Sequence, residues 1–275
     1  MSPIALTLAL GAAACHATWN VLLAKSKDTH AAFTLMLVLA IVFSAPLALA
    51  AGWRIGPRAW PFLLASAAIQ AIYIALLNIA YTRYELAVVY PLARGLGPVF
   101  MLAGSGLGGT ALPTAPQIRA VLVVCAGVLL VRGFKRSGHL RDVGVALLIA
   151  CCIAGYTLLD KLALQFASPL TYLTVVLVGP ALAHAAHTVR IRGPNALRAA
   201  VGWRTVAAAA ATVGSYSMGL VALQLAPAAP IAAVRETSVV IVTILAAVVL
   251  HERVSRIQML GAACVALGVA LMSRT

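Results

Sequence analysis

Residues 226–253, APAAPIAAVRETSVVIVTILAAVVLHER, indicate the fold class of this chain. Two prolines open an apolar run long enough to cross the ~30 Å hydrocarbon core of a bilayer. Arg235 and Glu236 lie about a third of the way along this run, and no further charge follows until Glu252. A charged side chain at the centre of a span costs roughly 2.5 to 3.5 kcal/mol on insertion scales, so the pair predicts a functional site.

The composition excludes an ordinary water-soluble domain. Of 275 residues, 63% are hydrophobic and only 9% are charged, whereas soluble domains carry about 25% charged residues. The apolar residues form ten segments near spanning length: 3–23, 31–51, 60–81, 87–106, 118–131, 143–164, 171–188, 205–223, 228–250 and 257–272. We therefore expect an all-α membrane protein with ten transmembrane helices, multi-pass in a cell membrane of the bacterial inner-membrane type.

The net charge of +14 does not indicate nucleic-acid binding, because Lys and Arg lie in the short connections between apolar segments. The odd-numbered connections carry most of these residues. Positive residues favour the cytoplasmic side, so the charge count predicts cytoplasmic odd connections and both termini outside. The expected partners are the lipid bilayer and a small-molecule substrate, and the chain is expected to be a monomer or a homodimer.

Motifs for enzyme chemistry and cofactors are absent from the sequence. The five cysteines lie inside apolar runs without CxxC or Cys/His spacing, so no metal or other cofactor is expected. No Walker lysine loop, HExxH or GxSxG is present. The sequence thus favours neither an enzyme nor an ATP-driven pump.

The two halves of the chain are related. Residues 85–91, ELAVVYP, align with residues 224–230, QLAPAAP, and after a two-residue slip Arg94 falls on Arg235. Each half holds five segments, so the second half must enter the membrane from the opposite side. This pattern predicts two inverted repeats, residues 1–134 and 142–275, joined by a basic loop at 135–141. Such repeats are typical of secondary transporters that bind substrate at the repeat interface near the midplane.

Several short motifs carry a family resemblance. They are HATWN at 16–20 with Lys25, YPLARG at 90–95, GYTLLDK at 155–161, RETS at 235–238 and LHERV at 250–254. In this order they resemble the drug/metabolite transporter (DMT) superfamily, specifically its ten-helix EamA-like members. The last motif is similar to the family's L-x-E-R signature, and LGGT at 107–110 departs from it in the first repeat.

The resemblance implies a small-molecule exporter or exchanger, driven by protons or by the membrane potential, without naming its substrate. It also implies cytoplasmic termini, which is the opposite of the charge count.

Arg94, Arg235 and Glu236 are the leading candidates for substrate binding. At 1.5 Å per residue, Arg94 and Arg235 each lie roughly 13 Å from opposite membrane faces, so we expect them to share one cavity. Arg235 and Glu236 point about 100° apart on a helix, so they do not simply pair with each other. We predict that Glu236 pairs with Arg94 and that Arg235 binds a carboxylate or phosphate. The alternative is a purely structural ion network.

Glu236 is also the candidate for proton coupling, because it is the one carboxylate that the segments place deep in a span. The alternative is a static counter-ion. Pro91, Pro98 and Pro230 are expected to break or kink their helices beside the cavity, since proline removes a backbone donor. For Pro230 the alternative is a position in the first helical turn.

Polar and aromatic residues complete the predicted site. His16 and Asn20 share a helix face beside Trp19, which indicates either a cavity lining or a hydrogen bond between helices. Tyr90 is a candidate for substrate stacking, or a member of an aromatic belt. Tyr156 and Asp160 repeat the four-residue spacing of His16 and Asn20 in the sixth segment. Asp160 and Lys161 are expected to form an interfacial pair.

The sequence therefore predicts a secondary active transporter with alternating access. The expected activity is export of a small polar metabolite or amino acid, anionic or zwitterionic, with proton coupling as one option. A flippase for a lipid-linked head group and a non-transporting membrane protein remain the alternatives.

Overall fold

The apolar segments form α-helices throughout the part of the chain that the structure describes. The structure is a computed structural model that describes residues 1–84, 86–106, 112–132, 140–250 and 255–274, with backbone alone for 78, 81–82, 86–88, 90–91, 132 and 245–250. Within these residues the β-type pairing is a single bridge between Ile55 and Ala167. The chain is therefore all-α.

Thirteen α-helices and one 3-10 turn lie within the described residues. They are α1 (Pro3–Ala24), α2 (Thr29–Ala50), η1 (Pro57–Ala59), α3 (Trp60–Arg83), α4 (Leu86–Ala103), α5 (Ala115–Arg132), α6 (Leu140–Ala163), α7 (Pro169–Val176), α8 (Val178–Arg192), α9 (Pro194–Ala199), α10 (Trp203–Leu225), α11 (Ala228–Arg235), α12 (Thr237–Leu250) and α13 (Arg256–Ser273). Each of the ten predicted segments coincides with one of these helices or with a consecutive pair. The short α9 is not predicted.

Helix starts follow from local capping residues. The Ser2 side chain accepts a hydrogen bond from the Ala5 backbone N–H at the start of α1. Asp28 does the same for α2, and Ser255 forms a capping box with Gln258 at the start of α13. Each cap satisfies a donor that the first helical turn leaves unpaired.

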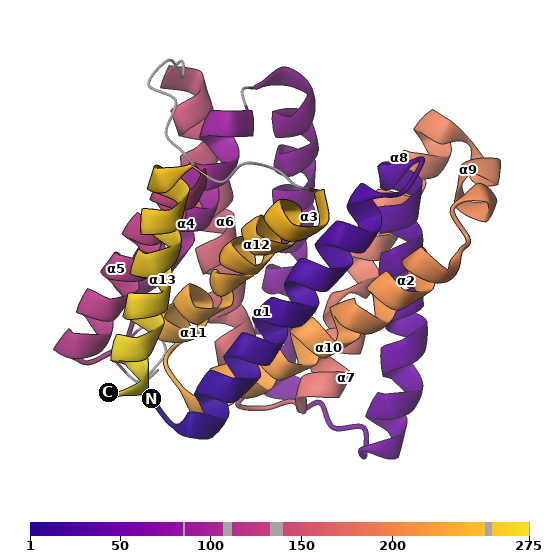
Figure 1. Ribbon diagram of the computed structural model, residues 1–275. Coiled ribbons are helices and arrows are strands. Elements are labelled where there is room, and N and C mark those ends of the chain that lie inside the picture. Colours follow the sequence, from indigo (N-terminus) through magenta and orange to yellow (C-terminus); the bar gives the residue numbers. More distant parts are fainter. Residues whose placement is uncertain (85, 107–111, 133–139, 251–254, 275) are drawn as a thin grey trace.

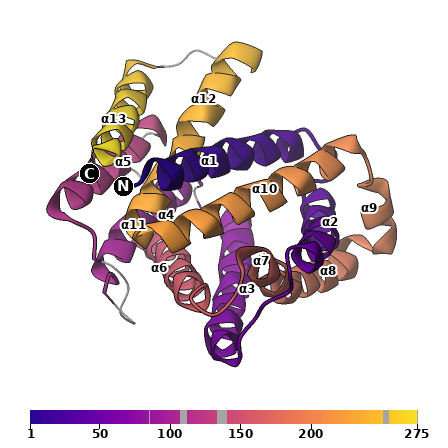
Figure 2. The same cartoon turned by 90° about the horizontal axis from the view of Figure 1, so that it is seen from below.

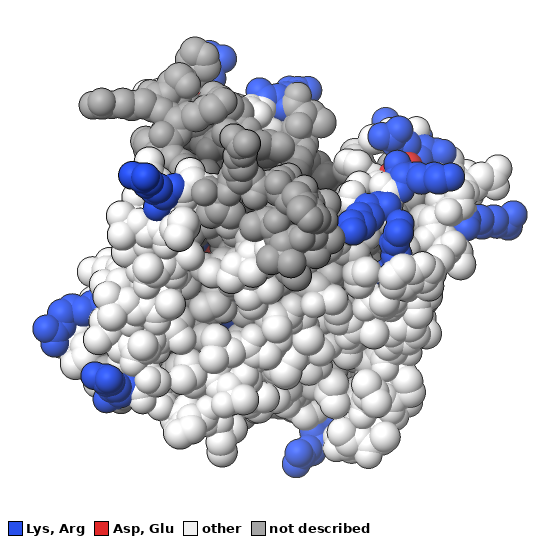
Figure 3. Space-filling view, viewed as in Figure 1, with Lys and Arg blue, Asp and Glu red and all other residues white. Residues whose placement is uncertain are grey.

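Seven described helices or helix pairs are long and apolar enough to cross a membrane, and two shorter apolar helices lie at Leu92–Ala103 and Ala115–Val131. On the face in Figure 3, Lys and Arg side chains lie toward the rim, and a broad central area carries neither charge. This distribution suits a protein whose flank lies against hydrocarbon.

The ninth predicted segment is not one continuous helix. It divides into α11 and α12 at Glu236, whose backbone N–H bonds back to the carbonyls of Ala232 and Ala233 at 3.2 and 3.1 Å. The seventh segment likewise divides into α7 and α8 at Leu177. The interruption at Glu236 brings a helix terminus into the middle of the predicted span.

The prolines do not end their helices, while a kink at Pro91 or Pro98 stays a prediction, and Pro230 takes the alternative position in the first helical turn. α4 continues through Pro91 and Pro98, and Pro230 is the third residue of α11. A missing N–H costs nothing in the first turn of a helix, which explains Pro230. Inside α4, each proline removes only one hydrogen bond, and in membrane helices neighbouring groups and small local adjustments compensate for that loss.

Helices from the two halves of the chain pack against each other (Figures 1 and 2). α1 lies along α10, α5 along α13, and α6 against α3 and α4. The α5–α13 contact needs glycine, since a Cβ at Gly261 would lie 2.6 Å from the Val131 backbone nitrogen and 2.7 Å from the Gly127 carbonyl oxygen. Small residues allow such close helix approach in membranes.

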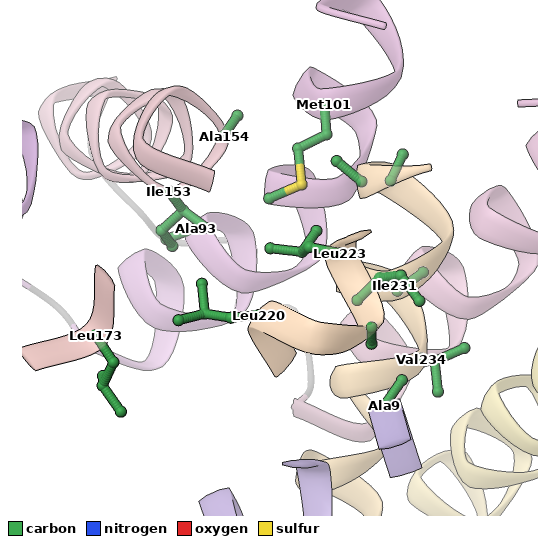
Figure 4. Packing of buried hydrophobic residues seen from close by; sticks show 14 of the residues in the cluster. Ala9, Ala93, Met101, Ile153, Ala154, Leu173, Leu220, Leu223, Ile231 and Val234 are labelled. Carbon is green, nitrogen blue, oxygen red and sulfur yellow. The ribbon is translucent and has the colours of Figure 1, made fainter. Parts of the chain in front are cut away.

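The buried core joins helices from both halves, as Figure 4 shows. Ile231 and Val234 of α11 pack near Leu220 and Leu223 of α10, with Met101 of α4 close by. All five of these side chains are at most 3% exposed. The packed core therefore fixes α11, and with it Arg235 and Glu236, against the first half of the chain.

The molecule has two distinct ends. We call one the Arg54 end; here the backbone N–H of Gly56 donates to the Phe166 carbonyl (2.8 Å) and that of Ser168 to the Arg54 carbonyl (3.0 Å). Both termini lie toward this end in Figure 1. The opposite end, with the connection between α1 and α2, we call the Lys25 end.

Candidate functional site

A cavity of about 540 Å³ lies between the two halves. It is lined by residues from α1, α2, α3, α4, α6, α8, α10 and α11, together with Leu177 and Glu236. Its lining includes the exposed Ala24 and Thr29 near the Lys25 end, whereas Gln70 and Leu223 toward the other end are 4% and 2% exposed. The cavity therefore opens toward the Lys25 end and is closed toward the Arg54 end.

Arg94 and Glu236 meet in the cavity wall, as the sequence predicts. Arg94 Nε lies 3.3 Å from Glu236 Oε2, and the two side chains are 15% and 9% exposed. Arg94 Nη2 also donates to His16 Nε2 at 3.3 Å. Because arginine has donors only, this contact requires an unprotonated Nε2 and thus a neutral His16.

Arg235 lies beside this pair but contacts an aromatic ring instead of a carboxylate. Its guanidinium carbon stands 6.0 Å from the centre of the Tyr216 ring. A Cβ at Gly219 would lie 3.4 Å from the same carbon, so the glycine leaves room for the guanidinium against α10. None of the described carboxylates lies within ion-pair distance of Arg235. The arrangement leaves its donors available to a bound anion.

His16, Trp19 and Asn20 all line the cavity from α1. The His16 and Trp19 rings contact edge to face, with centroids 4.8 Å apart. The Asn20 amide donates to the His16 carbonyl at 2.7 Å, so it bonds within its own helix rather than between helices. The buried Trp19 Nε1 makes no hydrogen bond to the described residues and is an available donor.

Tyr156 lines the cavity from the second half. Its ring lies 6.0 Å from that of Tyr73 on α3, in a tilted arrangement. Of the remaining predicted residues, Tyr90 and Pro91 have side chains outside the described part, and the LGGT and LHERV motifs fall largely or wholly outside it.

A comparison with protein families finds a match to the second half of the chain. The model of the EamA-like transporter family matches residues 142–274. Residues 142–274 are therefore similar to an EamA-like transporter domain. This similarity indicates a multi-pass membrane transporter, and the matched family is non-enzymatic.

The fold of the whole chain, including the part before the EamA-like domain, has a solved counterpart. Among 28 matching solved chains, one described only as "Crystal structure of protein" superposes with a TM-score of 0.78 at 15% identity. The match covers 100% of this chain and 98% of that one. At this identity the likeness concerns the fold alone. No curated protein matches the chain.

Two residues at the start of the EamA-like domain are not where the sequence places them. Asp160 and Lys161 are predicted as an interfacial pair, but Asp160 is 3% exposed. It accepts hydrogen bonds from Ser66 Oγ and, at 2.5 Å, from Tyr172 OH. Lys161 Nζ instead donates to the carbonyls of Leu223 (2.6 Å) and Ala226 (2.8 Å). Glu236 is therefore not the only deep carboxylate.

The lining of the cavity also contains residues that the sequence interpretation missed. Tyr216 and Thr212 of α10 lie four residues apart in an apolar segment, which is the same signal that singles out His16 and Asn20. His184 is 3% exposed, and its Nδ1 lies 2.7 Å from Thr34 Oγ1. The sequence interpretation did not single out His184, because its partner Thr34 lies in a different apolar segment.

Proposed function

We propose that the chain is a secondary active transporter that exports a small anionic or zwitterionic metabolite or amino acid by alternating access. The observation that carries the proposal is the position of Arg235. It lies in the wall of a cavity between the two halves, beside an Arg94–Glu236 pair that already neutralises the nearest carboxylate. A substrate carboxylate or phosphate supplies the missing partner.

Helix packing supports the proposed ten spans in two inverted five-helix repeats. If α1–α5 correspond to α6, α7–α8, α10, α11–α12 and α13, then the contact of α1 with α10 has its counterpart in that of α6 with α3. The contacts of α5 with α13 and of α2 with α7 and α8 map onto themselves. A pseudo-two-fold axis in the membrane plane interchanges the two halves and so produces this matching of helix contacts. The matched range 142–274 is close to the proposed second repeat, 142–275.

The balance of buried charge supports an anionic group on the substrate. Among the described residues of this region, Arg94, Lys161 and Arg235 oppose Asp160 and Glu236. With all five ionised, one positive charge remains, and with Asp160 protonated two remain. The unpaired donor of Trp19 adds to the same preference. An anion entering the cavity replaces its lost hydration with these donors.

The closed Arg54 end and the open Lys25 end suit one state of an alternating-access cycle. In the proposed second state the cavity opens at the Arg54 end instead. By the charge count the Lys25 end is cytoplasmic, and the state described is then inward-facing. The bacterial-type inner membrane and a monomeric or homodimeric state stay predictions.

Transport into proteoliposomes tests the proposal. Purified protein is given a panel of labelled amino acids and phosphorylated metabolites, and Arg235→Ala and Arg94→Ala are compared with Arg198→Ala, an exposed arginine on α9. We expect uptake to fall at least tenfold in the first two variants and to persist in the third. Normal uptake by both cavity variants would contradict the proposal. Glu236→Gln under an imposed pH gradient tests the proposed proton coupling separately.

A further inference from the structure

Asp160 is a buried carboxylate that the proposed anion site does not use. It lies one turn before the end of α6, with 3% of its surface exposed. Burying an ionised carboxylate away from water is costly unless a cation and hydrogen bonds compensate. Such a residue within a membrane span is a functional candidate by default.

The surroundings of Asp160 supply hydroxyl groups rather than a cation. Ser66 of α3 and Tyr172 of α7 both donate to Oδ1. The adjacent Lys161 points elsewhere, because its ammonium group binds two carbonyls at the turn between α10 and α11. Among the described residues, no Lys or Arg comes within 4.0 Å of the carboxylate. The site thus favours a neutral, protonated carboxyl group as long as it stays dry.

Asp160 lies between the cavity and the closed end of the molecule. On the cavity side, Gln70 donates to Ser66 Oγ at 3.1 Å, and Gln70 and Thr157 are part of the cavity lining. On the other side, Tyr172 belongs to α7, which begins at Pro169. Just before it in the chain, residues 166 and 168 form backbone hydrogen bonds with residues 56 and 54. The hydrogen bonds of Asp160 therefore join α3, α6 and α7 where the Arg54 end is closed.

We propose that Asp160 is a proton-binding site that controls access at the Arg54 end. The carboxyl group carries a proton while this end is closed and dry. When the end opens, water reaches the group and the proton passes to the solution there, leaving a hydrated carboxylate. Closing reverses the step, because a proton from the same solution binds the free carboxylate oxygen. Acid at the Arg54 end thus favours closure, and alkali favours opening.

Other ionisable groups face the same region from the elements that pack on α6. While these groups keep a constant charge, they add no pH dependence of their own to the protonation of Asp160. Those on the described elements are Tyr73 of α3, Arg94 of α4, Lys161 of α6 itself, Tyr172 of α7, Tyr216 of α10, Arg235 of α11 and Glu236 at the end of α11. Of these, Tyr172 alone bonds directly to the carboxyl group, as donor.

Hydrogen–deuterium exchange of the whole chain in lipid nanodiscs tests the inference without any substrate. Exchange of residues 54–66 and 164–173, corrected for the intrinsic effect of pH on exchange, is followed across the pH range in which the protein stays folded. We expect protection to be lost as the pH rises. Asp160→Asn, which keeps a hydrogen-bond acceptor but cannot release a proton, should remain protected at every pH.

Two outcomes would overturn the inference: protection that does not change with pH in the unaltered chain, or the same pH dependence in Asp160→Asn. Ser66→Ala and Tyr172→Phe retain the acid and serve if Asp160→Asn does not fold. Each should keep the pH dependence with a shifted midpoint, and an unchanged midpoint in both would contradict the role. Because no substrate is added, failure here leaves the proposed anion site untouched, and failure of anion binding leaves this result untouched.

Discussion

Arg94 Nε and Glu236 Oε2 lie 3.3 Å apart, and they come from α4 and from the junction between α11 and α12. The contact joins the two halves of the chain at the cavity wall. It also explains why Arg235, the residue next to Glu236, is left with an aromatic ring rather than a carboxylate beside it. The two adjacent charged residues thus have different surroundings, Glu236 beside Arg94 and Arg235 beside Tyr216.

Breaking this pair should destabilise the protein more than removing both charges. For fully buried pairs, loss of one partner costs about 3 to 5 kcal/mol, and we take this as an upper bound because the cavity is open at one end. Thermal unfolding in detergent should show lower melting temperatures for Arg94→Met and Glu236→Gln, with a partial recovery in the double variant. Additive losses in the double variant would show that the two groups are not coupled.

Lys161→Met should loosen the Arg54 end. The Lys161 ammonium group holds the last carbonyls of α10 through Leu223 and Ala226, which no longer have helical donors. A cysteine introduced within residues 54–66 reports on this end. We expect a membrane-impermeant maleimide to label it more in the Lys161→Met variant than in the chain that keeps Lys161. Lys27→Met, at an exposed position of the Lys25 end, is the control. Equal labelling of both variants would argue against a clamp.

Gly261→Ala should destabilise the packing of α5 on α13. The added Cβ meets backbone atoms of Val131 and Gly127 at 2.6 and 2.7 Å, which a side-chain rotation does not relieve. Overpacking of this kind costs typically about 1 to 3 kcal/mol. Gly144→Ala is the matched control, since nothing lies within 4 Å of its Cβ position. A melting temperature that falls equally in both variants would refute the predicted contact.

Cysteine labelling should reveal which end of the cavity is open. Ala24→Cys lines the open end and is exposed, while Leu223→Cys lies toward the closed end with 2% exposure. We expect an impermeant maleimide to label the first and spare the second. The charge count predicts that Ala24→Cys reacts only when the reagent reaches the cytoplasmic side. Labelling from outside would favour the orientation that the family resemblance implies.

The sequence was sufficient for the helices and for the pairing of Arg94 with Glu236. Both follow from geometry that a sequence contains: apolar length for the spans, and equal depth from opposite faces for the charges. The EamA-like domain was also predicted, because its motifs occur in a fixed order along the chain. These features depend on local spacing or on repetition.

The position of Asp160 and the break at Glu236 were not predictable in the same way. Asp160 lies near the end of an apolar segment, and only the packing of α3 and α7 over it makes it buried. The effect of the prolines was also left open by the sequence, because tolerance of a proline depends on neighbouring groups and on its place in the helix. Tertiary contacts decide both cases, and a single sequence does not contain them.

The most direct test of the central claim is ligand stabilisation of the purified protein in detergent. A panel of small carboxylates and phosphates is compared with their neutral amide or ester analogues, in the unaltered chain, in Arg235→Ala and in Arg198→Ala. A ligand at about a hundred times its dissociation constant stabilises a protein by about 2.7 kcal/mol. We predict that an anionic compound raises the melting temperature of the unaltered chain and of Arg198→Ala, and that its neutral analogue does not. Equal stabilisation of Arg235→Ala would contradict the proposed role of Arg235 in anion binding.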